Sequence, residues 1–322
     1  MRRHPIRQSL LAIIIASLVS GSAFAADEAK PDKPAAPTMA SVMDTAKDSD
    51  WRDLDPDNTL YMDLPGGRVV IELAPQFAPL GVDNIRTLVK HGYFDGLAII
   101  RSQDNYVVQW GDPDADNADD SENPPKSIGK AKAKVAGEYF RKAEGLPFTA
   151  LPDADSYAAQ TGFSGGFPVG RDGAEGRAWM THCYGTVGVA RGMEPDSGNG
   201  AQLYVIIGHA PRHLDRNVTL VGQVWAGMEL LSTLPRGKGP LGFYEDPSRR
   251  TSIASIKLAS DVPAEQRQSI QIMKTDSDTF RQLIQARRHR AEDWFLDPTD
   301  HLSVCNMIIP SRLKPVGDTV SE

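Results

Sequence analysis

The sequence predicts a mainly β fold, a β-barrel capped by helices, and two observations favour it. Short apolar runs of strand length recur through residues 58–258, and glycine- or proline-containing turns separate several of them. One helical pattern lies early in this region, at residues 80–91, and another lies late, at residues 227–234. Several short strands with an early and a late helix are typical of a barrel covered by helices.

The first predicted elements are a hairpin and a helix. Residues 58–63 and 68–73 are apolar runs, and a proline and two glycines at positions 65–67 predict a turn between them. Pro79 favours the start of the helix, and Gly92 favours its end. The apolar residues between them fall on one helix face: Val82, Ile85, Leu88 and Val89.

The other predicted strands lie on both sides of a long insertion. They cover residues 96–101, 106–111, 185–190, 203–207, 219–225 and 251–258. The insertion, residues 114–179, changes along its length from acidic to basic to glycine-rich. This composition predicts an irregular segment with one helix near residues 131–142 and a flexible loop at residues 162–176.

The two ends of the chain differ from the barrel region. Residues 1–25 combine a basic start, an apolar run and an Ala-Phe-Ala cleavage site, as in a cleaved signal peptide. Residues 26–50, rich in Ala, Pro, Lys and Asp, predict a disordered linker. The barrel domain is expected over residues 51–260. A partly helical C-terminal extension, residues 261–322, is expected to pack on it through its apolar residues.

The charge of the chain argues against nucleic acid as a partner. The formal net charge is −7, and cleavage after residue 25 lowers it to −10 because three arginines and no acidic residue leave. Nucleic-acid binding depends on Lys and Arg contacting phosphates. After the leader, no apolar run is long enough to span a membrane. We therefore expect a periplasmic monomer, with secretion into the medium as the alternative.

The chain contains two cysteines, Cys183 and Cys305. Export places them in an oxidising compartment, where a disulfide between the main domain and the C-terminal extension can persist. Sequence alone does not bring them within bonding distance, so two buried free thiols are the alternative.

Several short motifs follow one another in order through the barrel region. They are RVVIE at 68–72, VDN at 82–84, GYFDG at 92–96, Arg101 followed by QWGDP at 109–113, GTVGVA at 185–190, GNGAQLYV at 198–205, LD at 214–215 and VGQV at 221–224. Together they resemble the cyclophilin-type peptidyl-prolyl cis-trans isomerases. The resemblance implies an eight-stranded antiparallel barrel with a helix at each end, interrupted here by the insertion.

The same resemblance implies the site residues. Arg101 corresponds to the catalytic arginine, and Gln109 to the glutamine that orients it and holds the substrate backbone. The residues implied in substrate binding form the proline pocket and the wall and floor of the groove: Tyr106, Val107, Ala190, Gln202, Tyr204, His213 and Leu214. A surface salt bridge is the alternative reading of Arg101, and ordinary barrel core is the alternative for Val107 and Leu214.

The chemistry of the reaction explains why an arginine is needed. Resonance gives the amide bond before proline a rotation barrier of about 18–20 kcal/mol, although its two isomers are close in energy. In the twisted state the proline nitrogen becomes pyramidal and can accept a hydrogen bond from a permanently charged guanidinium. Such a bond, made mainly in the twisted state, contributes about 1.5–3 kcal/mol. The reaction requires no proton-transfer residue, metal or cofactor.

Four positions depart from the family pattern, and these departures leave alternative functions open. Ile100, Arg191 and Val218 stand where relatives often have His, Asn and His, and a large residue such as Trp is common at the position of His213. The first interpretation is an isomerase that acts on proline-containing polypeptides and assists the folding of exported proteins. The alternatives are a proline-peptide-binding chaperone or scaffold module with weak or no catalysis, and a barrel used for protein contacts alone.

Overall fold

A computed structural model describes residues 36–115 and 122–314 of the chain. The predicted signal peptide and the first part of the predicted linker lie outside these residues. Within the described ranges, no helix is both long enough and apolar enough to cross a bilayer.

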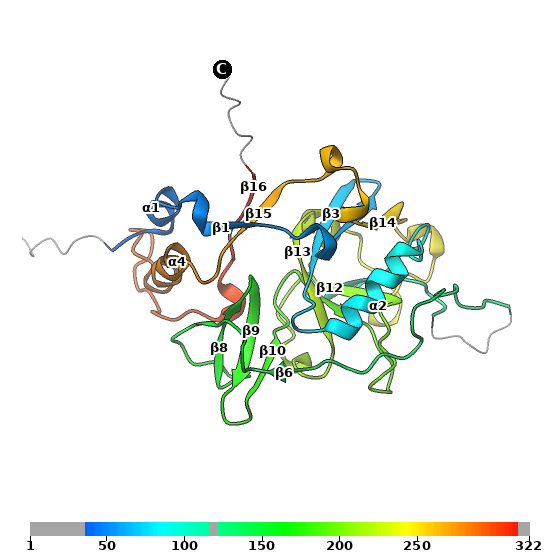
Figure 1. Ribbon diagram of the computed structural model, residues 1–322, viewed down its shortest axis with the longest axis horizontal. Coiled ribbons are helices and arrows are strands. Elements are labelled where there is room, and N and C mark those ends of the chain that lie inside the picture. Colours follow the sequence, from blue (N-terminus) through cyan, green and yellow to red (C-terminus); the bar gives the residue numbers. More distant parts are fainter. Residues whose placement is uncertain (1–35, 116–121, 315–322) are drawn as a thin grey trace, which may run out of the picture. The chain divides into compact units, whose positions relative to one another are not determined.

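An eight-stranded antiparallel sheet forms the barrel (Figure 1). In spatial order its strands are β14 (Ser255–Leu258), β2 (Thr59–Leu64), β3 (Gly67–Leu73), β13 (Leu220–Ala226), β11 (Thr186–Val189), β12 (Gln202–Ile206), β5 (Val107–Gly111) and β4 (Ala98–Ser102). The two edges of the sheet meet just before β14, where the amide of Ile99 donates to the carbonyl of Thr251 over 2.8 Å. The predicted fold class and all its predicted strands are confirmed.

The barrel core follows from the two-residue period of its strands. Alternate residues of β2 and β3 enter one apolar cluster: Leu60, Met62, Leu64, Val69, Ile71 and Leu73. Helix α2 (Pro79–Lys90) packs on this cluster with the apolar face that its sequence predicts, and Gly92 follows it with a φ of +65°. The late helix, α3 (Met228–Ser232), adds the buried side chain of Leu231.

A second apolar cluster lies on the outer face of the barrel, where Tyr61 of β2 and Val70 of β3 point away from the core. Most of its other side chains come from three parts of the chain, residues 36–54, 140–183 and 259–314. We call these three parts the accessory unit. They are far apart in sequence, so the cluster forms only when the chain folds back on itself.

The two ends of the described chain meet in a three-stranded sheet. Its strands, in order, are β1 (Trp51–Asp53), β15 (Ile270–Met273) and β16 (Ser311–Leu313). Helix α4 (Asp278–His289) confirms the predicted C-terminal helix, and Ser277 caps it by accepting a hydrogen bond from the amide of Phe280 over 3.1 Å.

Helix α1 (Met39–Asp44) lies beside α4 in Figure 1 and buries Val42 in the second cluster. The predicted disordered linker is therefore wrong from α1 onward. The physical reason is that Met39, Val42 and Met43 share one helix face, which finds an apolar partner surface in the C-terminal extension.

The insertion is more regular than its composition predicts. Its second half forms a five-stranded sheet in the order β6 (Arg141–Lys142), β10 (Arg177–Met180), β9 (Phe167–Asp172), β8 (Gln160–Ser164) and β7 (Thr149–Ala150). Gly165 and Gly166, with φ values of 58° and 94°, form the tight turn between β8 and β9. The predicted flexible loop at residues 162–176 is wrong, because two adjacent glycines between apolar runs favour a hairpin.

The predicted helix near residues 131–142 is also wrong. Backbone donors in this stretch bind other segments instead of their own preceding carbonyls: the amide of Val135 donates to Asp196 O, and that of Glu138 to Thr219 Oγ1. The Glu138 carboxylate in turn accepts two amides of the first turn of α2, over 3.0 and 2.8 Å. The insertion thus supplies the N-terminal cap that α2 lacks in its own sequence.

Candidate active site

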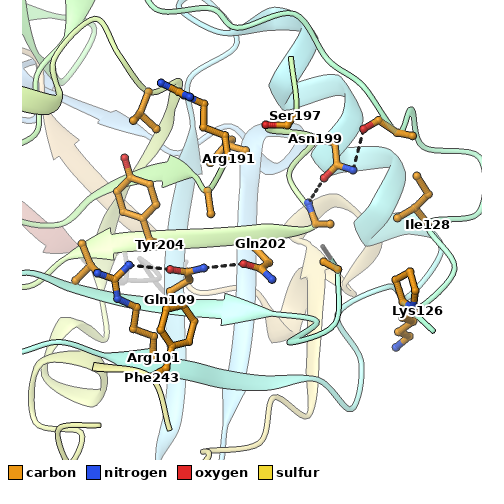
Figure 2. A pocket seen from close by; sticks show the side chains of 18 of the residues that line it. Arg101, Gln109, Lys126, Ile128, Arg191, Ser197, Asn199, Gln202, Tyr204 and Phe243 are labelled. Carbon is orange, nitrogen blue, oxygen red and sulfur yellow. Dashed lines mark hydrogen bonds between the residues drawn. The ribbon is translucent and has the colours of Figure 1, made fainter. Parts of the chain in front are cut away.

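Three polar side chains form a row across β4, β5 and β12. A register shift between Ile99 and Arg101 places Arg101 opposite Gln109. Arg101 Nη1 donates to Gln109 Oε1 over 3.2 Å, and Gln109 Nε2 donates to Gln202 Oε1 over 2.7 Å (Figure 2). Gln202 Nε2 donates to the carbonyl of Asp112 over 2.6 Å. Each amide is held at both ends, so the row orients the guanidinium of Arg101.

Arg101 also contacts two loops, one between β4 and β5 and one before β14. Its Nε donates to the carbonyl of Leu241 over 2.7 Å, and its Nη2 donates to the Gln103 side chain. The guanidinium carbon lies 5.6 Å from the ring centre of Tyr106 and 5.3 Å from that of Phe243. These partners are neutral, unlike those of a surface salt bridge. Burial lowers the pKa of Arg101, but an arginine starts so far above neutrality that it stays charged.

A cavity of about 970 Å³ lies in front of this row. Of the predicted site residues, eight line it: Arg101, Tyr106, Val107, Gln109, Ala190, Gln202, Tyr204 and Leu214. The aromatic and aliphatic members form an apolar wall beside the polar row, on the same face of β5 and β12, and Val107 and Tyr204 are themselves buried. The arrangement can hold a small apolar ring beside a fixed positive charge.

His213 does not join these residues. Its side chain is exposed and is not part of the cavity lining, because it follows Arg212 in a short turn that directs Leu214 to the cavity instead. Sequence reasoning missed Leu241 and Phe243, which line the cavity from a glycine-rich segment without strand or helix periodicity. It also missed the wall that residues 125–128 and 133–134 of the insertion contribute.

A buried polar network lies behind Tyr204. His182, which is fully buried, places Nε2 3.0 Å from the Tyr204 hydroxyl and Nδ1 2.9 Å from Asp215 Oδ1. A carboxylate can only accept, so Nδ1 carries a proton, and in the neutral imidazole Nε2 accepts from Tyr204. Arg212 Nε donates to the other oxygen of Asp215 over 2.5 Å.

The network keeps its groups in defined charge states. Burial by itself raises the pKa of Asp215, but the hydrogen bond from His182 and the charge of Arg212 outweigh it and hold this pKa below its usual value. Burial raises the pKa of Tyr204, so its hydroxyl stays protonated and can donate. Asp215 is therefore a carboxylate and Tyr204 a neutral phenol at neutral pH.

Next to His182, Cys183 forms a disulfide with Cys305. The two Cα atoms are 5.0 Å apart, although 122 residues separate the cysteines in sequence. The bond joins the segment between β10 and β11 to the C-terminal extension. The alternative of two free thiols does not describe this structure.

Comparison with known proteins identifies the family. The profile of the family described as "Cyclophilin type peptidyl-prolyl cis-trans isomerase/CLD" matches residues 59–258, more than half of the chain. The chain belongs to this family. This cyclophilin is 27% identical to probable peptidyl-prolyl cis-trans isomerases of Brucella suis and Brucella melitensis. Each of these matches extends over 196 residues, 61% of this chain and 81% of the relative.

A solved structure shares more than the barrel. The crystal structure of cyclophilin AquaCyp293 from Hirschia baltica matches with a TM-score of 0.64 and 26% sequence identity, over 86% of this chain and 97% of that chain. This share exceeds residues 59–258, so the similarity extends into the accessory unit.

Proposed function

We propose that this cyclophilin catalyses the cis–trans isomerisation of X-Pro bonds in exported polypeptides and so assists their folding in the periplasm. The observation that carries the proposal is the placement of Arg101. Its charge is held by neutral partners beside the apolar wall of the cavity and oriented by Gln109.

Catalysis follows from favouring the twisted amide over both planar isomers. The proline ring lies against the apolar wall formed by Val107, Tyr204 and Leu214, where burial of its methylene groups is favourable. An N–H of Arg101 then donates to the proline nitrogen as it loses conjugation. That nitrogen accepts poorly while the amide is planar, so the bond strengthens mainly in the twisted state and lowers the barrier.

Two features support the exported location. Residues 1–25 have the composition of a cleaved signal peptide. The Cys183–Cys305 disulfide suits an oxidising compartment such as the periplasm. Recovery of a chain that starts at Ala26 in the osmotic-shock fraction of the cell would support the proposal, and recovery of an uncleaved chain in the cytoplasm would contradict it.

Replacement of Arg101 tests the catalytic proposal. We expect Arg101→Ala to lower the rate of cis–trans exchange in an Ala-Pro peptide by at least about tenfold, because the charge-assisted bond to the twisted state is lost. Arg68→Ala is the matched control, since Arg68 pairs with Asp63 and does not line the cavity.

Each result decides between the candidate functions. Equal exchange rates in wild type and Arg101→Ala would remove Arg101 from the mechanism. Measurable binding of the peptide by the wild type without faster exchange would instead favour the alternative function, a proline-peptide-binding chaperone or scaffold module.

A further inference from the structure

We propose that the accessory unit sets the shape of the proline pocket through the buried polar network. The network runs from Asp155 through Arg212, Asp215 and His182 to Tyr204. This inference rests on the proposed function, in which the wall of the cavity holds the proline ring. The residues before Tyr204 in this network are positioning residues, because they act on the substrate only through the pocket wall.

The network begins in the insertion, where Asp155 forms a bidentate ion pair with Arg212. Arg212 Nη1 and Nη2 donate to the two carboxylate oxygens of Asp155, each over 3.0 Å, and only 5% and 9% of the two side chains are exposed. Asp155 Oδ1 also accepts the amides of Tyr157 and Ala158. The carboxylate is thus fixed within its own loop and presents one orientation to the arginine.

The second step places Leu214. The other side of the guanidinium donates from Nε to Asp215, three residues further along the same turn. Leu214 lies between these two partners and lines the cavity. A displacement of Arg212 therefore moves the turn that carries Leu214.

The third step places Tyr204. Asp215 Oδ1 accepts both the backbone amide and Nδ1 of His182, each over 2.9 Å, which fixes the imidazole ring in its plane. The ring stacks parallel to that of Tyr204, with an interplanar angle of 9°, and its Nε2 meets the Tyr204 hydroxyl. Two residues of the cavity wall, Leu214 and Tyr204, are thus held by one network.

A contribution to stability alone does not explain why this buried polar network is present. Buried ion pairs are often no more stabilising than apolar residues of the same volume, because both charges lose their hydration. What such a network does provide is directional contacts with a single geometry. The network ends at two residues of the cavity wall, Leu214 and Tyr204, so the single geometry of its contacts fixes the shape of the pocket.

The insertion itself supplies a matched control. Asp153, two residues before Asp155, forms the same kind of bidentate pair with Arg288 of α4, over 2.7 and 2.8 Å, and its side chain is 8% exposed. Neither Asp153 nor Arg288 lines the cavity. The two aspartates thus differ mainly in their arginine partners: Arg212 is linked to the cavity wall, and Arg288 is not.

The test compares Asp155→Asn with Asp153→Asn in the full mature protein. With an Ala-Pro tetrapeptide as the probe, we expect Asp155→Asn to raise KM about three- to tenfold and to leave kcat within about twofold, because ground-state positioning is lost. The control should leave both constants unchanged, although both variants should lower the melting temperature. We also expect the NMR resonances of the Leu214 methyls and the Tyr204 ring to shift only in Asp155→Asn.

Two results would overturn the inference. One is an equal rise of KM in both variants, which would show general loosening of the insertion. The other is an Asp155→Asn protein with unchanged KM and unchanged Leu214 and Tyr204 resonances. A wild type without activity would contradict the proposed function instead, and the resonance comparison would then decide the inference by itself.

Discussion

The barrel and the accessory unit reach their stability by different routes. The barrel encloses one apolar core inside a sheet whose edges meet. The accessory unit contains two small sheets, the three-stranded one and the five-stranded one of the insertion, and contacts between distant segments join its three parts: Trp51 with Met273, Cys183 with Cys305, and Asp153 with Arg288. Its apolar cluster is assembled from parts that are far apart in sequence, so the unit depends on these contacts. The comparison teaches that the two regions should be separable by mutation.

The largest expected effect comes from removing one buried ring in each region. Phe94 belongs to the barrel core, and Phe280 packs edge-to-face on Phe163 at 5.2 Å in the accessory unit. Replacement of either by Ala should lower the free energy of unfolding by about 3–5 kcal/mol through lost burial and a new cavity. Hydrogen exchange read by mass spectrometry should show faster exchange in β3 and β13 for Phe94→Ala, and in β15 and α4 for Phe280→Ala. Equal loosening of both regions in Phe280→Ala would break the comparison.

A smaller effect is expected from removing the disulfide. The Cys183→Ser, Cys305→Ser double variant lacks this bond, which joins two residues with a sequence separation of 122. We expect the free energy of unfolding to fall by about 2–4 kcal/mol, chiefly because the unfolded chain regains freedom. Urea unfolding followed by circular dichroism measures it, with reduced wild type as the control. A variant with an unchanged urea midpoint would show that apolar packing alone holds the extension.

The same division explains what could be predicted from sequence. Barrel strands such as β2 and β3 have local turn signals and apolar runs, and the site residues Arg101 and Gln109 lie in motifs with a recognisable spacing. The accessory unit gives fewer such signals: α1 has only six residues and depends on its contact with α4, although Gly165 and Gly166 do favour the β8–β9 hairpin. Outside this unit, the amides of Val135 and Glu138 bond to acceptors on other segments, which no local pattern predicts. Phe243 reaches the cavity from an irregular loop, and His213 leaves it because of a turn set by Arg212. Contacts of this kind depend on tertiary structure, which local patterns do not contain.

The smallest effect, and the last way to sharpen the comparison, is acid destabilisation. The hydrogen bond from Arg288 lowers the pKa of Asp153 in the accessory unit, and Lys314 lowers the pKa of Asp53 in β1 mainly through a hydrogen bond. A carboxyl whose pKa is lower when folded contributes stability above its unfolded value, about 3.9, and loses it as the pH falls through the folded value. The urea midpoint should therefore stay nearly constant from about pH 7 to 5 and fall below about pH 4. Asp153→Asn should start lower at neutral pH and show a shallower fall, because it has one such carboxyl fewer. Parallel curves for the two proteins would mean that the Asp153 carboxyl does not contribute to the acid sensitivity, and they would contradict this prediction.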